Sequence, residues 1–236
     1  EKRSPWAWIP SLYFAEGLPY VVVMTLSVIM YKRLGVSNTD IALFTIGFIF
    51  LGDQAHLEPV RRLDKNEALV DFGMQLLIGG GMAGVGFVLP GDFFLRFTLA
   101  FFWLMAFSSA THDIAADGFY MLGLTEEQQA FFIGIRNTFY RVAMLTGQGL
   151  LVMLADFGES TGRISFAWSL VFFVLAGTFI ALALWHKYIL PRPASDAQRT
   201  NITPHTILVE FGNTFVSFFN KKGIVPALLF MLTYRL

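Results

Sequence analysis

The stretch from Phe93 to Leu122 reads FFLRFTLAFFWLMAFSSATHDIAADGFYML. It is apolar at its start and turns acidic where it should still be inside a bilayer, because a spanning helix needs roughly 20 apolar residues. Asp113 and Asp117 are one helical turn apart and share a face, and His112 lies beside them. A carboxylate at membrane depth is costly and is tolerated mainly toward a bundle interior or a wet cavity. The stretch therefore predicts a membrane helix around which a transporter's polar lining is built.

The composition indicates that lipid is the solvent of this chain. Of its 236 residues, 55% are hydrophobic and 14% are charged, and the mean hydropathy is +0.58. Soluble domains carry about 25% charged residues. The net charge is zero, which argues against a nucleic-acid partner. Cysteine is absent from the sequence, which excludes disulfides and thiolate chemistry.

Apolar runs separated by polar loops predict an all-α membrane protein with a six-helix bundle in residues 1–190. The second run has only 12 residues, too few to span comfortably, and residues 53–72 then carry eight charges. We therefore expect this span either to continue irregularly or to be altered. Ser37–Asp40 and Thr125–Gln129 are expected to cap the helices that follow them. The expected spans are residues 6–31, 41–52, 73–89, 93–122, 130–154 and 164–190.

The rest of the chain suggests half of a two-bundle transporter. Residues 191–222 are expected to form a cytoplasmic central loop. Residues 223–236 begin a seventh span that is cut off, so we expect a part of a longer protein. With the N-terminus placed inside, ten lysines and arginines fall in inside segments and three in outside segments. This bias predicts a cytoplasmic N-terminus.

The third expected span is rich in glycine. Gly80 and Gly84 have the G-x-x-x-G spacing, and small faces let membrane helices approach closely. We expect these glycines to serve helix packing.

Charged residues inside the expected spans fall at two depths, since a helix rises about 1.5 Å per residue. Glu16 and Arg141 lie near the membrane midplane, and Asp113 and Arg136 lie nearer the cytoplasmic side. We expect pairing at each depth where the helices adjoin, because an unpaired charge there is expensive. The ion pair expected between Arg136 and Asp113 has two interpretations, a structural clamp between helices or a direct part in coupling.

Several residues near these charges are candidates for a transport site. Arg141 is a candidate substrate contact, because a guanidinium suits carboxylate or phosphate groups. Glu16 is a candidate proton carrier. Further proton-coupling candidates are Asp113, Asp117, which could instead be solvated at the inner surface, and His112, which could instead be a hydrogen-bonded neighbour of an acid. The other candidate substrate contacts are Asn137 and Gln148, on one stripe with Arg141, and Tyr13 and Tyr20, which flank Glu16.

Three segments resemble the AmpG-type muropeptide permeases of the major facilitator superfamily. They are SLYFAEGLPY (Ser11–Tyr20), LGVSNTDIALF (Leu34–Phe44) and THDIAADG (Thr111–Gly118). The third is similar to the family's D-I-x-x-D signature, and Arg136 in the next span also fits. The related eukaryotic acetyl-CoA transporters are similar at this level. The resemblance covers residues 5–45 and 73–236, and residues 46–72 depart from the family's second helix.

This resemblance implies a twelve-helix fold, a cytoplasmic N-terminus and alternating access. It also implies proton-coupled import of anhydro-muropeptides across a bacterial inner membrane. The expected partners are an anionic glycopeptide, protons and the lipid bilayer. We expect no cofactor and no metal.

Other functions remain open at this point. A transporter could instead carry another organic anion, such as an acyl-CoA or a sugar phosphate. An intramembrane hydrolase using Asp113, Asp117 or His112 is disfavoured, because both aspartates point the same way and no converging catalytic set is evident; we expect no enzymatic activity. A membrane signalling protein would need no polar midplane, and Glu16 with Arg141 argues against it.

Overall fold

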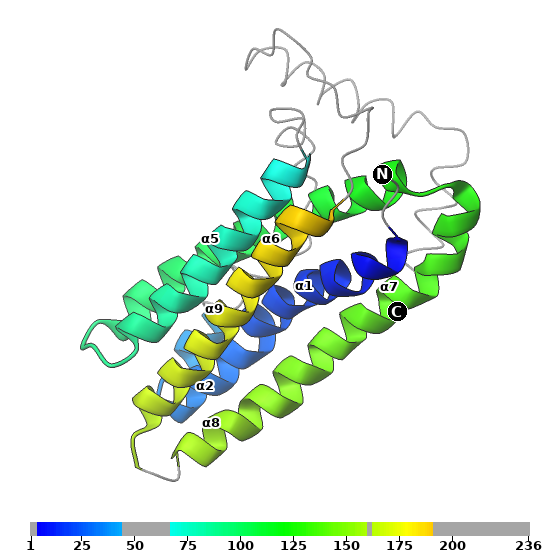
Figure 1. Ribbon diagram of the computed structural model, residues 1–236. Helices are drawn as coiled ribbons and strands as arrows, with labels where there is room; N and C mark the ends of the chain where they lie inside the picture. The colour runs from blue at the N-terminus through cyan, green and yellow to red at the C-terminus, as the bar shows by residue number, and fades with distance from the viewer. Residues whose placement is uncertain (1–3, 44–66, 160–161, 191–236) are drawn as a thin grey trace, which may run out of the picture.

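The apolar runs of the sequence form helices throughout the described part of the protein. The computed structural model describes residues 4–43, 67–159 and 162–190, and no strand occurs within these ranges. Figure 1 shows the long helices lying side by side along a common direction. The all-α prediction is thus confirmed for these residues.

Within the described ranges, five helical segments are long and apolar enough to cross a membrane, so the chain has the character of a multi-pass membrane protein. Residues 38–43 are also helical. The rest of the expected span 41–52, the expected loop 191–222 and the expected seventh span 223–236 lie outside the described residues. The candidate spans are Pro5–Arg33, Asp71–Val88, Phe94–Gly123, Glu126–Asp156 and Ile164–Ile189.

The first span is a chain of short elements rather than one uniform helix. Pro19 lies inside α1 and cannot donate a backbone hydrogen bond, and the next turn, η2, widens to π geometry. The elements are η1 (Pro5–Ala7), α1 (Ile9–Val21), η2 (Val22–Leu26) and α2 (Ser27–Arg33).

The later spans are longer and more regular. Helix α5 begins at Glu67 rather than at residue 73, and it takes Asp71 and Gln75 into the bundle. A second π turn, η3, separates α7 from α8. The elements are α5 (Glu67–Val88), α6 (Phe94–Gly123), α7 (Glu126–Leu145), η3 (Thr146–Leu150), α8 (Leu151–Glu159) and α9 (Ile164–Ile189).

Two helix starts follow the expected capping pattern. Thr125 accepts a hydrogen bond from the backbone of Gln128, whose side chain accepts from the backbone of Thr125, which is a complete capping box. Ser37 Oγ accepts from Asp40 N at 3.1 Å ahead of the helix over residues 38–43. Both predictions of caps are confirmed.

Helices α1 and α7 run parallel and in close contact. Trp6 packs edge-on against Phe132 near their starts, with ring centroids 5.2 Å apart. Farther along, a Cβ on Gly17 would lie 2.8 Å from Tyr140 O, and one on Gly147 would collide with Val21. The two backbones approach this closely only because glycine has no side chain at these positions.

Helix α5 lies between α6 and α9 and runs antiparallel to both (Figure 1). Gly84 packs against Phe101 of α6, and a Cβ on Gly81 would lie 2.7 Å from Met105 Cγ. No atom would lie within 4 Å of a Cβ on Gly80. The expected packing role is therefore right for Gly84 and wrong for Gly80, because Gly80 faces away from the neighbouring helices.

Two separate apolar clusters fill the bundle, and polar side chains lie between them along the helices. The larger cluster includes Leu26, Val85 and Phe172, and the smaller one, near the N-terminus of α1, includes Trp8, Leu12 and Phe119. On α6, the larger cluster ends at Met105 and the smaller begins at Ala116. The polar side chains on α6 between these limits form the sites described below.

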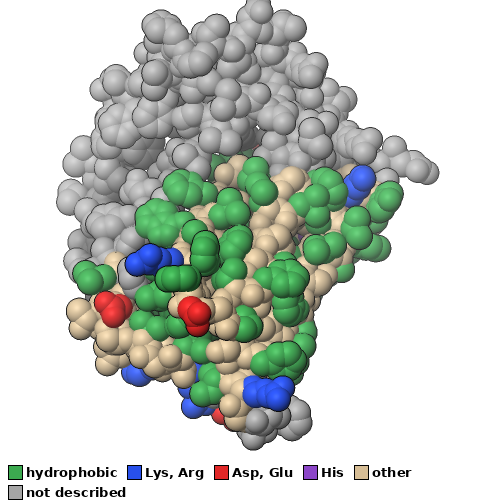
Figure 2. Space-filling model, turned by 90° about the vertical axis from the view of Figure 1, so that its left-hand side faces the viewer, with side chains coloured by type: hydrophobic (Ala, Val, Ile, Leu, Met, Phe, Trp, Pro, Cys, Tyr) green, Lys and Arg blue, Asp and Glu red, His purple; other side chains and the backbone are tan. Residues whose placement is uncertain are grey.

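The outer surface of the bundle suits a lipid environment. Figure 2 shows hydrophobic side chains over much of one described face, with few charged ones among them. Large apolar side chains such as Phe87, Phe131 and Met153 are more than half exposed. Such exposure is unfavourable in water and ordinary against acyl chains.

Candidate functional site

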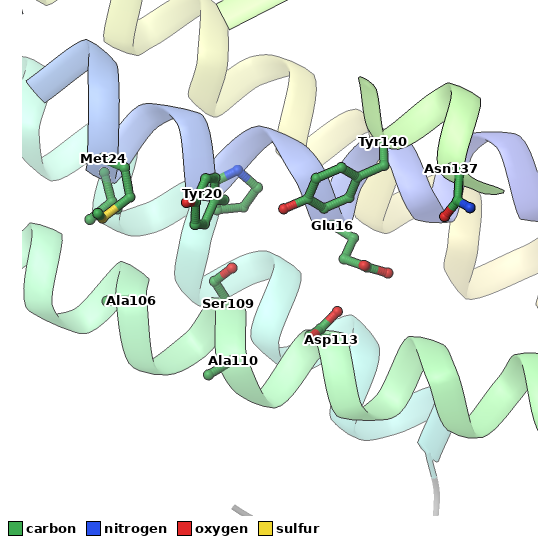
Figure 3. Close-up of a pocket in the computed structure, with 11 residues that line it drawn as sticks. Glu16, Tyr20, Met24, Ala106, Ser109, Ala110, Asp113, Asn137 and Tyr140 are labelled. Carbon is green, nitrogen blue, oxygen red and sulfur yellow. The ribbon is translucent and has the colours of Figure 1, made fainter. Parts of the chain in front are cut away.

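Two carboxyl groups face each other between α1 and α6. Glu16 and Asp113 point toward one another (Figure 3), and their carboxyl groups are close enough to interact. A carboxylate has only acceptor oxygens, so a direct hydrogen bond between the two groups would require a proton on one of them. Glu16 Oε2 is buried and has no hydrogen-bond partner. The pair is thus suited to holding a proton, and Glu16 Oε2 has room for a further donor.

The pair lies at the wall of a cavity of about 340 Å³ between α1, α6 and α7. A volume of this size is at the lower end of small-molecule sites. Its polar groups come from all three helices, and apolar side chains fill the rest of the wall. The lining residues are Glu16, Pro19, Tyr20, Val23, Met24, Ala106, Ser109, Ala110, Asp113, Asn137 and Tyr140 (Figure 3).

The contact between α1 and α7 sets the shape of this wall. Gly17 follows Glu16 directly and lies against the backbone of Tyr140. Because Gly17 lets α7 approach, Tyr140 and Asn137 reach the same cavity as Glu16. The glycine therefore acts on the cavity through the position of the neighbouring helix.

A second charged group lies next to the cavity, toward the N-terminus of α1. Arg136 Nη2 contacts Asp117 Oδ1 at 3.0 Å, and Tyr13 Oη donates to the same oxygen at 3.1 Å. The Arg136 guanidinium lies over the rings of Tyr13 and Tyr120, 4.4 and 5.1 Å from their centroids. Such stacking fits a planar cation held in place by aromatic faces.

Both predicted ion pairs are wrong. Arg136 pairs with Asp117 and not with Asp113, and Glu16 meets Asp113 and not Arg141. The depth argument used only the rise along each helix. The direction in which a side chain leaves the helix decides the partner, and Asp113 is directed at α1.

The remaining predicted site residues are distributed as follows. Tyr20 and Asn137 line the cavity. Tyr13 is 1% exposed and belongs to the Arg136 group instead. Arg141 and Gln148 are exposed and are not among the residues that line the cavity.

His112 belongs to a third polar group, on the other side of α6. Its Nε2 lies 3.1 Å from Asp71 Oδ1 and 3.0 Å from Gln75 Nε2, both on α5. Gln75 Oε1 in turn lies 2.9 Å from His186 Nδ1 on α9, and His186 Nε2 lies 2.9 Å from Ser11 Oγ on α1. Asp71, Gln75, His112 and His186 are each 0% exposed.

Sequence reasoning missed three members of this group, Asp71, Gln75 and His186. Asp71 lies in a charged stretch that was not assigned to a span, and His186 lies at the end of one. The signal in the sequence that could have predicted this group is the presence of polar residues at those ends of three spans that meet in the bundle. Within the described residues, no group of three or more His, Cys, Asp or Glu side chains is arranged to hold a metal ion.

Comparison with known proteins gives little further information. No known family model matches the chain. A Haemophilus influenzae protein described as uncharacterized is 31% identical over 144 residues, which cover 56% of this chain and 29% of that protein. The chain therefore spans less than a third of that relative's length. Neither finding names an activity.

The chemistry available at the cavity is proton binding and polar recognition. The lining offers two carboxyl groups, two phenols, a hydroxyl and an amide, and it includes no Lys or Arg among the described residues. These groups form hydrogen bonds to hydroxyl, amide or ammonium groups of a ligand. They are not arranged to bind an anionic group directly at the carboxyl pair.

Proposed function

We propose that this chain is the N-terminal bundle of a secondary active transporter of the major facilitator type. In this proposal it belongs with the AmpG-type permeases and imports anhydro-muropeptides together with protons by alternating access. Its location is then a bacterial inner membrane, with the N-terminus in the cytoplasm. The sequence resemblance supports the substrate class, and the site described above supports the mechanism.

The observation that carries the proposal is the pair of facing carboxyl groups, Glu16 and Asp113, at the wall of a cavity. Carboxyl groups within membrane helices are costly and commonly mark ion or proton pathways. In this proposal, one proton is shared between the two groups. Removing that proton leaves two like charges side by side, so proton binding and the packing of α1 on α6 are linked.

The lining also limits which part of the substrate binds where. Glycan hydroxyls and peptide amides suit Ser109, Asn137 and Tyr140, whereas a carboxylate of the substrate needs a cation. Arg141 is one helical turn from Asn137 on the same face of α7. We therefore assign the glycan to the cavity and the anionic end of the ligand to Arg141.

Uptake into vesicles tests this proposal. The full-length protein is reconstituted, and accumulation of labelled anhydro-muropeptide is measured with and without an inward proton gradient. We expect gradient-driven accumulation in the wild type. In Glu16→Gln we expect accumulation to fall to the level without a gradient, while binding at equilibrium is retained.

The controls separate the proposal from its alternatives. An acyl-CoA and a sugar phosphate compete for uptake only if the carrier takes organic anions generally. Unchanged proton-driven uptake in Glu16→Gln would exclude Glu16 from coupling. Absence of uptake and binding of all three ligands by the wild type would favour a non-transport membrane protein.

A further inference from the structure

The polar group formed by Asp71, Gln75, His112 and His186 is separate from the cavity and is not used by the mechanism above. His112 and Asp113 are adjacent in α6, but Asp113 faces α1 and the cavity, whereas His112 faces α5. Four helices contribute to the group, since Ser11 of α1 completes it. Burying this many polar atoms is tolerated only when each finds a partner.

The hydrogen bonds around Asp71 are one proton short. Gln75 Nε2 donates to Asp71 Oδ2 at 2.8 Å and faces His112 Nε2 at 3.0 Å. If that histidine nitrogen accepts from Gln75, it has no hydrogen for Asp71 Oδ1, 3.1 Å away. The buried oxygen then has no donor. One proton held between Asp71 Oδ1 and His112 Nε2 satisfies the carboxyl group.

The hydrogen bonds at the His186 end of the group are also one proton short. Gln75 Oε1 only accepts, so His186 Nδ1 carries a hydrogen. Ser11 Oγ lies 3.2 Å from Trp8 O, to which it donates, and 2.9 Å from His186 Nε2. The single hydroxyl hydrogen cannot serve both contacts. A proton on His186 Nε2 lets Ser11 accept from the ring and still donate to Trp8.

Among the described residues, few other charges surround the group. Within that part of the chain, the titratable groups that face His112 are Asp71 from α5 and His186 from α9, and α1 contributes the hydroxyl of Ser11. The nearby Lys187 is exposed and lies over the Phe72 ring, 5.1 Å from its centroid. The proton count of the group is therefore set mainly by its own members. His112 Nδ1 is also buried without a partner, so the group is not saturated.

We propose that Asp71, His112 and His186 form a second proton-binding site, distinct from the Glu16–Asp113 cavity, whose bound protons, one at each end, complete the hydrogen bonds joining α5 and α9 to α1 and α6. Gln75 is the bridge between its two ends. Loss of either proton leaves a buried oxygen or ring nitrogen without a partner, which weakens the contact among the four helices. This inference does not depend on the transported substrate.

Histidine ring nitrogen resonances test the site. The full chain, labelled with ¹⁵N in its histidine rings, is titrated in lipid nanodiscs over roughly pH 5–9. We expect the signals of His112 and His186 to change together with a common midpoint, because coupled groups titrate as a unit. The other two histidines, His56 and His205, provide internal references.

Three variants distinguish a proton site from a structural clamp. In Asp71→Asn, the His112 midpoint moves by about one pH unit or more. In Gln75→Met, which keeps the length of the side chain, the responses of His112 and His186 separate. Glu16→Gln leaves both responses unchanged, whatever its effect on uptake, so this test and the transport test fail independently.

Two outcomes would overturn the proposal. The first is a wild type in which neither buried histidine responds to pH, and this readout needs no variant to fold. The second is a pH response of His112 and His186 that is the same in Asp71→Asn and in Gln75→Met as in the wild type. Either result would make the group a fixed clamp between helices.

Discussion

Helix α6 serves two polar regions that differ in access to water. Successive residues on a helix point about 100° apart, so Asp113 enters the cavity between α1 and α7 while His112 enters the closed group beside α5 and α9. The cavity is lined by partly exposed side chains. In the closed group, Asp71, Gln75 and the two histidines have no exposed surface at all.

This difference separates two uses of the same chemistry. Carboxyl groups beside a cavity can exchange a proton and meet a ligand without any movement of the bundle. A closed group exchanges its proton only when the helices around it part. The carboxyl pair at the cavity is suited to repeated exchange of protons. In the closed group, the protonation state is linked to the contact between the helices. The predictions that follow test whether the two regions really differ in this way.

The largest expected difference is in stability. Asp71→Ala removes one partner from a closed network and leaves Gln75 and His112 without the carboxyl group that they contact, which costs about 3–5 kcal/mol in buried ionic groups. Asp113→Ala opens onto the cavity, where water replaces the lost carboxyl, and the cost is about 1 kcal/mol. Denaturant unfolding of the full chain in one detergent measures both. Equal losses of unfolding free energy in the two variants would show that the two regions do not differ in their access to water.

A double variant sharpens this result. Replacing Asp71 and His112 together with leucine removes both polar partners, and well-packed apolar residues often restore the stability that a single deletion loses. We expect Asp71→Leu with His112→Leu to be more stable than Asp71→Ala. A double variant that is less stable than the single one would mean that the polar contacts themselves stabilise the bundle.

The second prediction concerns the wall of the cavity. Gly17→Ala places a Cβ 2.8 Å from Tyr140 O, a backbone atom that cannot rotate away, so α1 and α7 must separate. Overpacking of this kind costs about 1–3 kcal/mol. Gly134→Ala on α7 is the matched control, because its Cβ would have no atom within 4 Å.

The readouts for this pair are thermal stability and ligand affinity. Gly17→Ala moves Tyr140 and Asn137 relative to Glu16, so the affinity for the proposed muropeptide ligand falls together with the thermal stability. Gly134→Ala leaves the thermal stability and the ligand affinity unchanged within the error of the wild-type measurements. A Gly17 variant with normal affinity would show that the cavity does not depend on the contact between α1 and α7.

Local signals in the sequence predicted the helices and their caps well. The Thr125 capping box and the Ser37 cap depend on residues three positions apart, and the structure forms both. The facing of Glu16 and Asp113 was not predicted. Both residues lie in helical segments long and apolar enough to cross a membrane. The choice of partner depends on helix rotation, which a single span does not encode.

The closed group was the least accessible to prediction. Asp71 belongs to a stretch with eight charges between residues 53 and 72, and such a stretch is typical of a loop. It is buried because Gln75, one turn along the same helix, donates to its Oδ2, and His112 of α6 lies 3.1 Å from its Oδ1. Tertiary contacts therefore override a local pattern at this position, and α5 starts earlier as a result.

The smallest effect separates the two arginines of α7. Arg136 lies over Tyr13 and Tyr120 and pairs with Asp117, whereas Arg141 is exposed. In Arg136→Lys the charge remains and the planar stacking is lost, which costs about 0.5–1 kcal/mol. We expect lower thermal stability and unchanged affinity for the proposed muropeptide ligand.

Arg141→Lys should give the opposite result. The exposed side chain contributes little to stability, so the unfolding midpoint stays where it is. A lysine cannot reproduce the two-point contact of a guanidinium with a carboxylate, so the affinity for an anionic ligand falls while that for a neutral glycan does not. If Arg136→Lys lowered affinity and Arg141→Lys did not, the anion contact would belong to the Asp117 group. The uncharged side chains of Asn137, Ser109 and Tyr140 would then lie between the Glu16–Asp113 pair and an anion-binding site at the Asp117 group.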